Sequence, residues 1–356
     1  MAPEFRIGST PVGLAHPTYF IADIAANHDG DLEQAKHLMT LAKEAGADCA
    51  KFQHFRAEHI VSDVGFRALG SQQDHQATWK KSVFEVYAEA SLPWSWTAEL
   101  AAHGEDIGIE FMSAPYDLEA VRHLDPYVSA YKIGSGDINW LEELRLVAEQ
   151  GKPMLLATGA ATMTDVQRAV SLIQEAGVPL ALMQCNTNYT GSLDNIAHVN
   201  LRVISTYAER FPDVVLGLSD HTPGHVTVLG AVTLGARVIE KHFTDDTARV
   251  GPDHGFSMDP VTWRAMVDAT RQLESALGTG VKDIEANERK TEVLQRRCVR
   301  TASDLAAGSI LRREDLVVLR PAPADGIPAN DVESLVGRRL AASLGAGQHV
   351  RWADLD

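Results

Sequence analysis

Two histidines, His221 and His242, end consecutive apolar segments in the sequences SDHT and RVIEKHF. A neutral imidazole at the end of a buried strand can bind a first-row divalent metal, and a pair of them leaves positions open for water or substrate. A histidine in such a place can also be a structural residue with satisfied hydrogen bonds. We predict that His221 and His242 are metal ligands and keep the structural role as the alternative.

Two lysines, Lys51 in CAKFQHF and Lys132 in AYKIGS, also lie in apolar surroundings. A lysine at the end of a buried strand needs an anion, which the phosphate or carboxylate of a small substrate can supply. Near the second histidine, Glu240 and Lys241 add two more ionisable groups. Because side chains alternate along a strand, we expect Glu240 to share the face of His242 and Lys241 to lie on the other face.

The apolar segments alternate with amphipathic helical patterns from residue 20 to about residue 277. We predict strands at 20–26, 49–55, 109–115, 130–135, 154–159, 180–185, 214–220 and 237–243. Eight strands alternating with helices over roughly 260 residues are typical of a (β/α)₈ barrel, an α/β fold with its functional groups at the carboxyl ends of the strands. A doubly wound open sheet is the alternative.

Domain boundaries follow from the places where this pattern changes. We predict a barrel domain over residues 1–277, a charged linker containing a helix over 278–298, and a small Gly-rich domain with short strands over 299–356. The longest insertion, residues 56–92, lies between the second and third strands. We expect it to form a short helix or a lid over the barrel mouth.

Composition excludes several classes of function. A net charge of −16 argues against a nucleic-acid-binding or anionic-membrane-binding surface. No apolar stretch approaches the ~18 residues of a transmembrane helix, and the first residues lack a signal-peptide pattern. The three cysteines, Cys49, Cys185 and Cys298, are far apart and odd in number. They predict no disulfide framework and indicate a reducing, cytoplasmic location.

Five longer motifs occur in the order ADIAANHDGDLEQAKHLMTLAKEAGADCAKFQ, YKIGSGDI, GLSDHT, GARVIEKHFTDDTARVGPDH and RRCVRTASDLAAGSILRREDLVVLRP. Over roughly residues 18–350 they resemble the sialic acid synthase family of phosphoenolpyruvate-dependent nonulosonate synthases. The resemblance implies a TIM barrel followed by a small antifreeze-like (SAF) domain. It also implies a domain-swapped homodimer in which each SAF domain covers the active site of the partner.

The resemblance implies a reaction between phosphoenolpyruvate and an open-chain amino aldose. C3 of phosphoenolpyruvate attacks the aldehyde, water adds at C2, and phosphate leaves with cleavage of its C–O bond, which yields a 3-deoxy-2-ulosonic acid. A divalent metal, Mn²⁺ or Mg²⁺, polarises the aldehyde.

By motif, the resemblance implies catalytic roles for Asp23, Lys51, Lys132, His221 and His242, with the two histidines as metal ligands. It implies substrate contacts for Gln53, Ser135, Asp137, Thr187, Tyr189, Ser219, Asp253 and Arg320. Arg320, in the sequence VLRP, matches the SAF arginine that reaches the sugar in the neighbouring subunit.

Some motifs depart from the family pattern. Asp23 stands where a glutamate is usual, Ala157 replaces a serine that contacts phosphate, and QCNTNYT replaces the usual HCxSxYP. These changes touch both the phosphate pocket and the sugar pocket. Two other functions therefore stay open: a Schiff-base aldolase with Lys132 or Lys241 as the nucleophile, and a non-catalytic sugar-binding relative.

Overall fold

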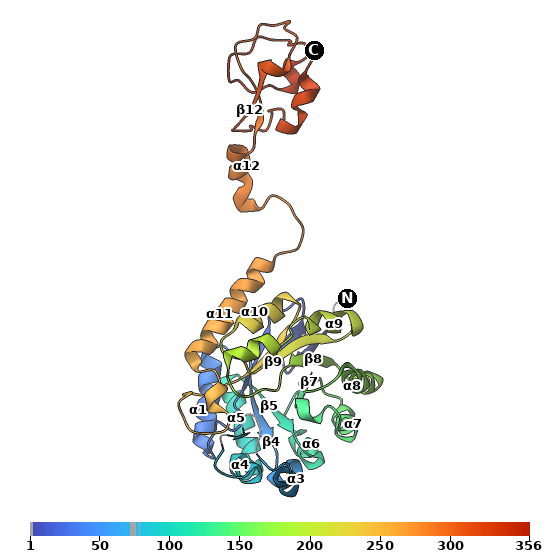
Figure 1. Cartoon of the computed structure of the whole chain (residues 1–356), viewed down its shortest axis with the longest axis vertical. Helices are drawn as coiled ribbons and strands as arrows, with labels where there is room; N and C mark the ends of the chain where they lie inside the picture. Colours follow the sequence, from blue (N-terminus) through green and yellow to red (C-terminus); the bar gives the residue numbers. More distant parts are fainter. Residues whose placement is uncertain (1–2, 72–75, 78) are drawn as a thin grey trace. The chain divides into compact units, whose positions relative to one another are not determined.

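The structure is a computed structural model that describes residues 3–71, 76–77 and 79–356 (Figure 1). The chain divides into two compact units, Met1–Gly278 and Thr279–Asp356. Among the residues described, no helix combines the length and the apolar character needed to cross a lipid bilayer.

The larger unit is built around eight parallel strands. These are β3 (Tyr19–Asp23), β4 (Cys49–His54), β5 (Glu110–Pro115), β6 (Tyr131–Ile133), β7 (Met154–Ala157), β8 (Leu180–Cys185), β9 (Val215–Asp220) and β10 (Val238–His242). Their order in the sheet is β5-β4-β3-β10-β9-β8-β7-β6, so the first barrel strand pairs with the last. The two ends of this order, β5 and β6, also lie next to each other. The prediction of a (β/α)₈ barrel is therefore confirmed, and the open doubly wound sheet is excluded.

Helices follow the strands and cover the outside of the barrel (Figure 1). They are α1 (Leu32–Glu44), α5 (Thr97–Ile107), α6 (Leu118–Leu124), α7 (Leu141–Glu149), α8 (Met163–Glu175), α9 (Val203–Arg210), α10 (Val226–Thr233) and α11 (Pro260–Leu277). Helix α1 begins at Asp31, whose side chain accepts hydrogen bonds from the backbone N–H groups of Glu33 and Gln34. It ends before Gly46, which has a positive φ of 96°. Its buried residues, Ala35, Leu38, Met39 and Ala42, share the face that packs on the barrel.

A hairpin that the sequence reading did not predict closes the amino-terminal end of the barrel. It consists of β1 (Glu4–Ile7) and β2 (Thr10–Gly13), which pair antiparallel. Its buried side chains are Phe5, Ile7 and Val12, and they share one apolar cluster with inward-facing residues at the starts of the barrel strands. We call this cluster the barrel floor: Phe5, Ile7, Val12, Tyr19, Ile21, Cys49, Met112, Ala130, Leu155, Ala181, Met183, Val215 and Val238.

Among its described residues, the insertion after β4 forms three short helices rather than one. They are α2 (Ala57–Ile60), α3 (Asp63–Ala68) and α4 (Val83–Ala90). Helix α4 begins with a capping box, in which Ser82 and Glu85 satisfy each other's backbone N–H groups. Part of the predicted lid, residues 72–75 and 78, lies outside the described residues.

The smaller unit contains one helix, one pair of strands and several 3-10 turns among its described residues. Helix α12 (Arg289–Gln295) precedes the antiparallel strands β11 (Cys298–Thr301) and β12 (Leu316–Leu319). A compact apolar cluster holds the unit together: Val299, Leu311, Leu316, Ile327, Leu335, Leu340 and Val350. This unit therefore has a core of its own, as a separate small domain requires.

Candidate active site

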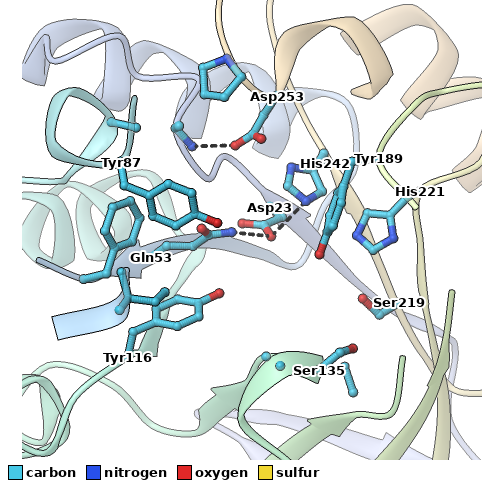
Figure 2. A pocket seen from close by; sticks show the side chains of 18 of the residues that line it. Asp23, Gln53, Tyr87, Tyr116, Ser135, Tyr189, Ser219, His221, His242 and Asp253 are labelled. Carbon is cyan, nitrogen blue, oxygen red and sulfur yellow. Dashed lines mark hydrogen bonds and ion pairs between the residues drawn. The ribbon is translucent and has the colours of Figure 1, made fainter. Parts of the chain in front are cut away.

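A cavity of about 430 Å³ opens at the carboxyl ends of the barrel strands (Figure 2). Of the residues predicted to act in a site, all but Thr187 and Arg320 line it: Asp23, Lys51, Gln53, Lys132, Ser135, Asp137, Tyr189, Ser219, His221, His242 and Asp253. They come from almost every strand end, which is where a barrel of this type assembles its functional groups.

Two lysines and two carboxylates form a buried ionic network at the base of this cavity. The Nζ atom of Lys51 lies 2.6 Å from Asp23 Oδ2 and 3.5 Å from Glu240 Oε1, and Lys132 Nζ lies 3.1 Å from the same Glu240 oxygen. The Ser219 hydroxyl donates to that oxygen at 3.3 Å. Burial alone would raise the pKa of Glu240, but Lys132 and Lys51 lower it to about 2, so this carboxylate is ionised. The network therefore holds two cations side by side at the strand ends.

Asp23 is the most constrained carboxylate of the cavity. Its Oδ2 accepts from Lys51 and, at 3.2 Å, from Gln53 Nε2, and it lies 3.5 Å from His242 Nε2. Its buried Oδ1 has no hydrogen-bond partner among the described residues. Burial raises the pKa of Asp23, and the ion pair with Lys51 offsets only part of this effect. A carboxylate with one unoccupied oxygen can take up or release a proton.

The two histidines face the same part of the cavity, with ring centroids 5.4 Å apart. The Nδ1–H of His221 donates to the carbonyl oxygen of Asn186 at 2.9 Å, which leaves the Nε2 lone pair available. Nδ1 of His242 is buried without a partner among the described residues. Burial lowers the pKa of His221 to about 4 and that of His242 to about 3, so both rings are neutral at pH 7. Tyr189 packs edge-on against His221, with ring centroids 4.4 Å apart.

These properties suit a metal with few protein ligands. Both histidines are unprotonated near neutral pH, as metal binding requires. In the part of the chain that the structure describes, no group of three or more His, Cys, Asp or Glu residues is arranged to hold a metal ion. A metal at His221 and His242 would therefore complete its coordination with water or substrate oxygens.

Asp137 and Asp253 are two further carboxylic acids that line the cavity. Asp137 belongs to a 3-10 turn after β6, and Asp253 Oδ2 accepts the backbone N–H of Ala26 at 3.1 Å. Burial raises the pKa of Asp137 to about 6 and that of Asp253 to about 7. Both side chains are hydrogen-bonding groups with little affinity for an anion.

The loop that carries Asp253 is anchored by residues that the sequence reading did not single out. His254 is fully buried, with Nδ1 2.6 Å from Thr244 Oγ1 and Nε2 3.0 Å from Asp29 Oδ1. Asn27 donates to the carbonyl oxygen of Phe243 at 2.9 Å. The charged NHDGD and GPDH motifs therefore meet in space, and their contacts fix the loop.

Ser135, Thr187 and Ala157 lie close together where β6, β7 and β8 end. Ser135 Oγ accepts the backbone N–H of Gly159 at 2.9 Å. A Cβ atom at Gly159 would lie 2.5 Å from Thr187 Cγ2, so Thr187 packs on this glycine instead of lining the cavity. Ala157 does line the cavity, where its methyl group offers no hydrogen bond.

Arg320 is an exposed residue of the smaller unit, directly after β12. None of the described residues forms a hydrogen bond or ion pair with its side chain. Arg320 is therefore not among the residues that line the cavity of the larger unit.

Lys241 lies outside the cavity, as strand alternation predicted. Its Nζ lies 2.5 Å from Asp220 Oδ2 and donates to the carbonyl oxygen of Thr222 at 2.6 Å. Asp220 is also hydrogen-bonded by the hydroxyl of Thr227 at 2.7 Å. Lys241 is thus a buried structural cation that does not reach a substrate in the cavity, which removes it as a Schiff-base nucleophile there.

An aromatic wall forms the remaining side of the cavity, and the sequence reading missed it. It consists of Phe55, Trp79, Tyr87 and Tyr116. The ring centroid of Phe55 lies 5.4 Å from that of Tyr87 and 6.0 Å from that of Tyr116. Figure 2 shows Tyr87 and Tyr116 across the cavity from Tyr189 and the two histidines. The predicted insertion over the barrel mouth was the available signal for Trp79 and Tyr87, whereas Phe55 and Tyr116 lie outside it.

Known proteins resemble this chain over most of its length. The model of the NeuB family matches residues 38–282, and that of the SAF domain matches residues 296–356. The N,N'-diacetyllegionaminic acid synthase of Legionella pneumophila is 34% identical, with 98% of each chain covered. The N-acetylneuraminate-9-phosphate synthase of Homo sapiens is 32% identical, with 94% of this chain and 91% of that protein covered.

A solved structure has a similar fold over the matched part of the chain. The N-acetylneuraminic acid (sialic acid) synthetase of Leptospira borgpetersenii, in complex with citrate, has a TM-score of 0.71 at 27% identity. The match covers 82% of this chain and 95% of that one.

Proposed function

This chain belongs to the NeuB family, and from that premise we propose that it condenses phosphoenolpyruvate with an open-chain aldose to give a 3-deoxy-2-ulosonic acid and phosphate. One observation carries the proposal: two buried lysines and two neutral histidines converge on one cavity. The lysines can hold an anionic donor, and the histidines can hold the group that activates a carbonyl. Together they fit an enzyme that joins the two.

The donor subsite is the part of the cavity around the two lysines. Phosphoenolpyruvate carries a carboxylate and a phosphate, and Lys51 and Lys132 offer one cation to each. Ser135 and Ser219 line the same region and add hydroxyl donors. Without a donor, Glu240 occupies the space between the lysines and keeps the two like charges together.

His221 and His242 are the residues that would hold a divalent metal, Mn²⁺ or Mg²⁺. When bound, the metal supplies a Lewis acid for the aldehyde oxygen of the acceptor. The chain supplies two unprotonated nitrogens, fixes the His221 ring through Asn186, and packs the Tyr189 ring against it.

Asp23 is the residue to which we assign proton movement. The water that adds at C2 must lose a proton, and the unpaired Oδ1 of Asp23 can accept it. Its neighbours are Lys51 on the donor side and His242 on the acceptor side. Gln53 holds its other oxygen and so fixes the direction of the free one.

The acceptor subsite is the part of the cavity beside the two histidines. Gln53, Asp137, Tyr189 and Asp253 line it and offer hydrogen bonds to sugar hydroxyls and amides. Thr187 supports this region by packing and is not assigned a direct contact.

The working enzyme is a homodimer in this proposal, with Arg320 reaching the sugar bound by the partner. The exposed and unpaired state of the Arg320 side chain supports a contact outside its own unit. Three free cysteines support a reducing compartment, and we place the reaction in the cytoplasm.

Subunit exchange tests this assembly. We expect His242→Ala and Arg320→Ala each to be inactive alone and a mixture of the two to regain activity. After random exchange, about one quarter of the sites in a twofold dimer have both residues intact. Demonstrated exchange without recovery would place Arg320 in its own chain's site or outside the reaction.

Phosphate release tests the reaction itself. The purified enzyme should release phosphate from phosphoenolpyruvate only with both an aldose and a divalent metal present. When the bridging oxygen of phosphoenolpyruvate is labelled, the label should appear in the phosphate. Label retained in the sugar acid, or covalent trapping of pyruvate by borohydride, would contradict the proposal.

A further inference from the structure

Three residues that line the cavity are direct chain neighbours of one ionic cluster outside it. The lining residues are Phe55, Ile60 and Tyr116. Their neighbours form a cluster around one carboxylate, which we call the Asp117 cluster: Arg56, His59 and Asp117. Whatever fixes this cluster therefore also fixes the backbone at three places in the cavity wall.

The Asp117 cluster lies where β4 and β5 separate. The last residues paired in the sheet are His54 and Pro115, and the backbone N–H of Tyr116 donates to the carbonyl oxygen of His54 at 3.1 Å. Beyond this point one segment enters α2 and the other enters α6. The cluster joins the two segments through side chains immediately after the backbone pairing ends.

The two oxygens of Asp117 have separate partners. Oδ1 accepts the backbone N–H groups of Glu119 at 2.9 Å and Ala120 at 2.7 Å, which begins α6. Oδ2 accepts from Arg56 Nη2 at 2.9 Å and from His59 Nδ1 at 2.8 Å. The Asp117 side chain is only 8% exposed, so solvent ions screen these contacts weakly. One carboxylate thus fixes the start of α6 and the position of α2.

Arg56 is held on its other sides as well. Its guanidinium carbon lies 4.5 Å from the ring centroid of Trp94, and Nη2 donates to Glu119 Oε2 at 2.7 Å. Trp94 in turn stacks on His123 of α6, with ring centroids 4.9 Å apart. The contacts use both the charge and the flat face of the guanidinium, a combination that lysine does not offer.

We propose that Asp117 is a positioning residue for the condensation: its Oδ2 holds α2 through the Asp117 cluster and so sets the position of the three neighbouring lining residues. The inference rests on the proposed function, because the wall affects the reaction only if the aldose is bound in this cavity. Reaction rates depend steeply on the placement of bound substrate, so a displaced wall lowers them.

Asp117→Asn separates the two tasks of this side chain. Asparagine caps a helix about as well as aspartate, so α6 should keep its start. The amide NH2 then replaces the oxygen that accepts from Arg56 and His59. We expect kcat/KM for the aldose to fall about tenfold, mainly through KM, while the KM for phosphoenolpyruvate stays unchanged. Unchanged kcat/KM, or an equal rise in both KM values, would overturn the inference.

Asp259→Asn is the matched control. Asp259 also begins a helix, α11, where its Oδ1 accepts the backbone N–H of Thr262 at 2.7 Å, and it is not among the described residues that line the cavity. It should change no kinetic constant. Both variants leave His221, His242 and Arg320 unaltered, so their metal content should equal that of the parent. An equal loss of kcat/KM in the control would assign the effect to helix capping and overturn the inference.

A double-variant cycle tests whether Asp117 acts through Arg56. Arg56→Gln alone should lower kcat/KM for the aldose in the same direction as Asp117→Asn. The combined variant should be no less active than the weaker of the two single variants, because each single change already breaks the same contact. Losses that multiply in the combined variant would show that the two residues act independently, which contradicts the proposal.

Hydrogen exchange separates this inference from the proposed function, because it needs no substrate. The backbone N–H of Val61 donates to the carbonyl oxygen of Ala57 at 2.8 Å and reports on α2. It should exchange about tenfold faster in Asp117→Asn than in the parent or in Asp259→Asn, while the amides of α6 exchange as in the parent. Unchanged exchange in α2 would overturn the inference. If no aldose supports phosphate release by the parent enzyme, the proposed function fails, and the exchange rates still decide whether Asp117 holds α2.

Discussion

The two ends of the barrel are built from the same strands and have opposite chemistry. At the floor, Ile21 of β3 and Val238 of β10 point inward and pack against the amino-terminal hairpin. Two residues further along the same strands, Asp23 and Glu240 point inward at the mouth and bind the lysines. Every second residue of a strand faces the same side of the sheet. The last floor residue and the first active-site residue of both strands are therefore only two positions apart.

The difference is one of free energy as well as of function. Burying a valine or isoleucine at the floor stabilises the fold by about 1.5–3 kcal/mol. At the mouth, Asp23 Oδ1, Glu240 Oε2 and His242 Nδ1 are buried with no partner among the described residues. Each such atom costs about 1–3 kcal/mol. The apolar burial at the floor therefore offsets the free-energy cost of the unpaired polar atoms at the mouth. Substitutions at the floor should lower stability, whereas substitutions of the lining residues at the mouth should lower activity.

The largest effect should come from the mouth. His242→Ala should lower phosphate release by about 10³-fold or more, equivalent to about 4 kcal/mol in the barrier, because the carbonyl-activating group loses a ligand. The thermal midpoint should stay the same or rise, because a buried nitrogen without a partner is removed.

Steady-state kinetics, metal content of the purified protein and calorimetry measure these effects. The exposed His198 supplies a control, His198→Ala, which should change none of them. Full activity of the metal-stripped enzyme would show that no metal is needed.

The neighbouring residue on the opposite face should behave differently. Lys241→Met leaves the buried Asp220 without its cation and should cost about 3–5 kcal/mol of unfolding free energy. The kcat of the folded fraction should be unchanged, since Lys241 does not line the cavity. Urea titration and active-site-normalised kinetics measure the two quantities. Adding Asp220→Asn should recover part of the stability; a loss of kcat at full stability would contradict the division between the faces.

At the floor, Val12→Ala should reduce the free energy of unfolding by about 2 kcal/mol, because two buried methyl groups are lost and a cavity is left. We expect kcat and the aldose KM to stay unchanged. Val261→Ala is the matched control in the same unit; that valine is 78% exposed and its loss should change stability by less than about 0.5 kcal/mol. A fall in kcat in Val12→Ala would mean that the two ends are coupled.

The smallest effect concerns the pH dependence of stability. Burial raises the pKa of Asp253 from its ordinary 3.8 to about 7, so between these values the folded state keeps a proton that the unfolded state has lost. The free energy of unfolding should then fall as pH rises through this window, and the loss is complete above the folded pKa.

Asp253→Asn should remove that loss. At pH 8 the variant should be more stable than the parent by about 1–3 kcal/mol, with partial exposure taken into account, and the difference should vanish as the pH approaches the unfolded pKa. Urea titrations across the pH range measure it, with the exposed Asp106→Asn as a control. A stabilisation that grows toward low pH would have the wrong sign.

The mouth could be predicted from the sequence because its signals are local. An ionisable residue after an apolar run is costly wherever the strand is buried, and Lys51, Lys132 and His242 each gave that signal independently. Strand alternation also predicted that Glu240 and Lys241 lie on opposite faces of the strand. The family motifs added the roles of these residues and the second domain.

The floor and the aromatic wall could not be predicted in this way. The hairpin strands have only four residues each, which is too short for a clear periodic pattern. Their apolar side chains are buried only because they pack against the open end of the barrel. Tyr87 and Tyr116 are distant in sequence, and both rings contact Phe55 in the folded chain. Thr187 shows the limit of a motif position: its predicted substrate contact stays a prediction, and its methyl group lies against Gly159.

The pairing of β3 with β10 also sets the earliest point at which the folding chain can become active. During synthesis Asp23 leaves the ribosome long before His242, yet the two are opposite each other in the closed sheet. Contacts between such distant parts of a chain form late and slowly. A growing chain that lacks β10 cannot contain a working site. Until β10 pairs, the apolar residues of the floor also stay partly exposed to water. The return of activity during refolding should therefore never precede the pairing of β3 with β10.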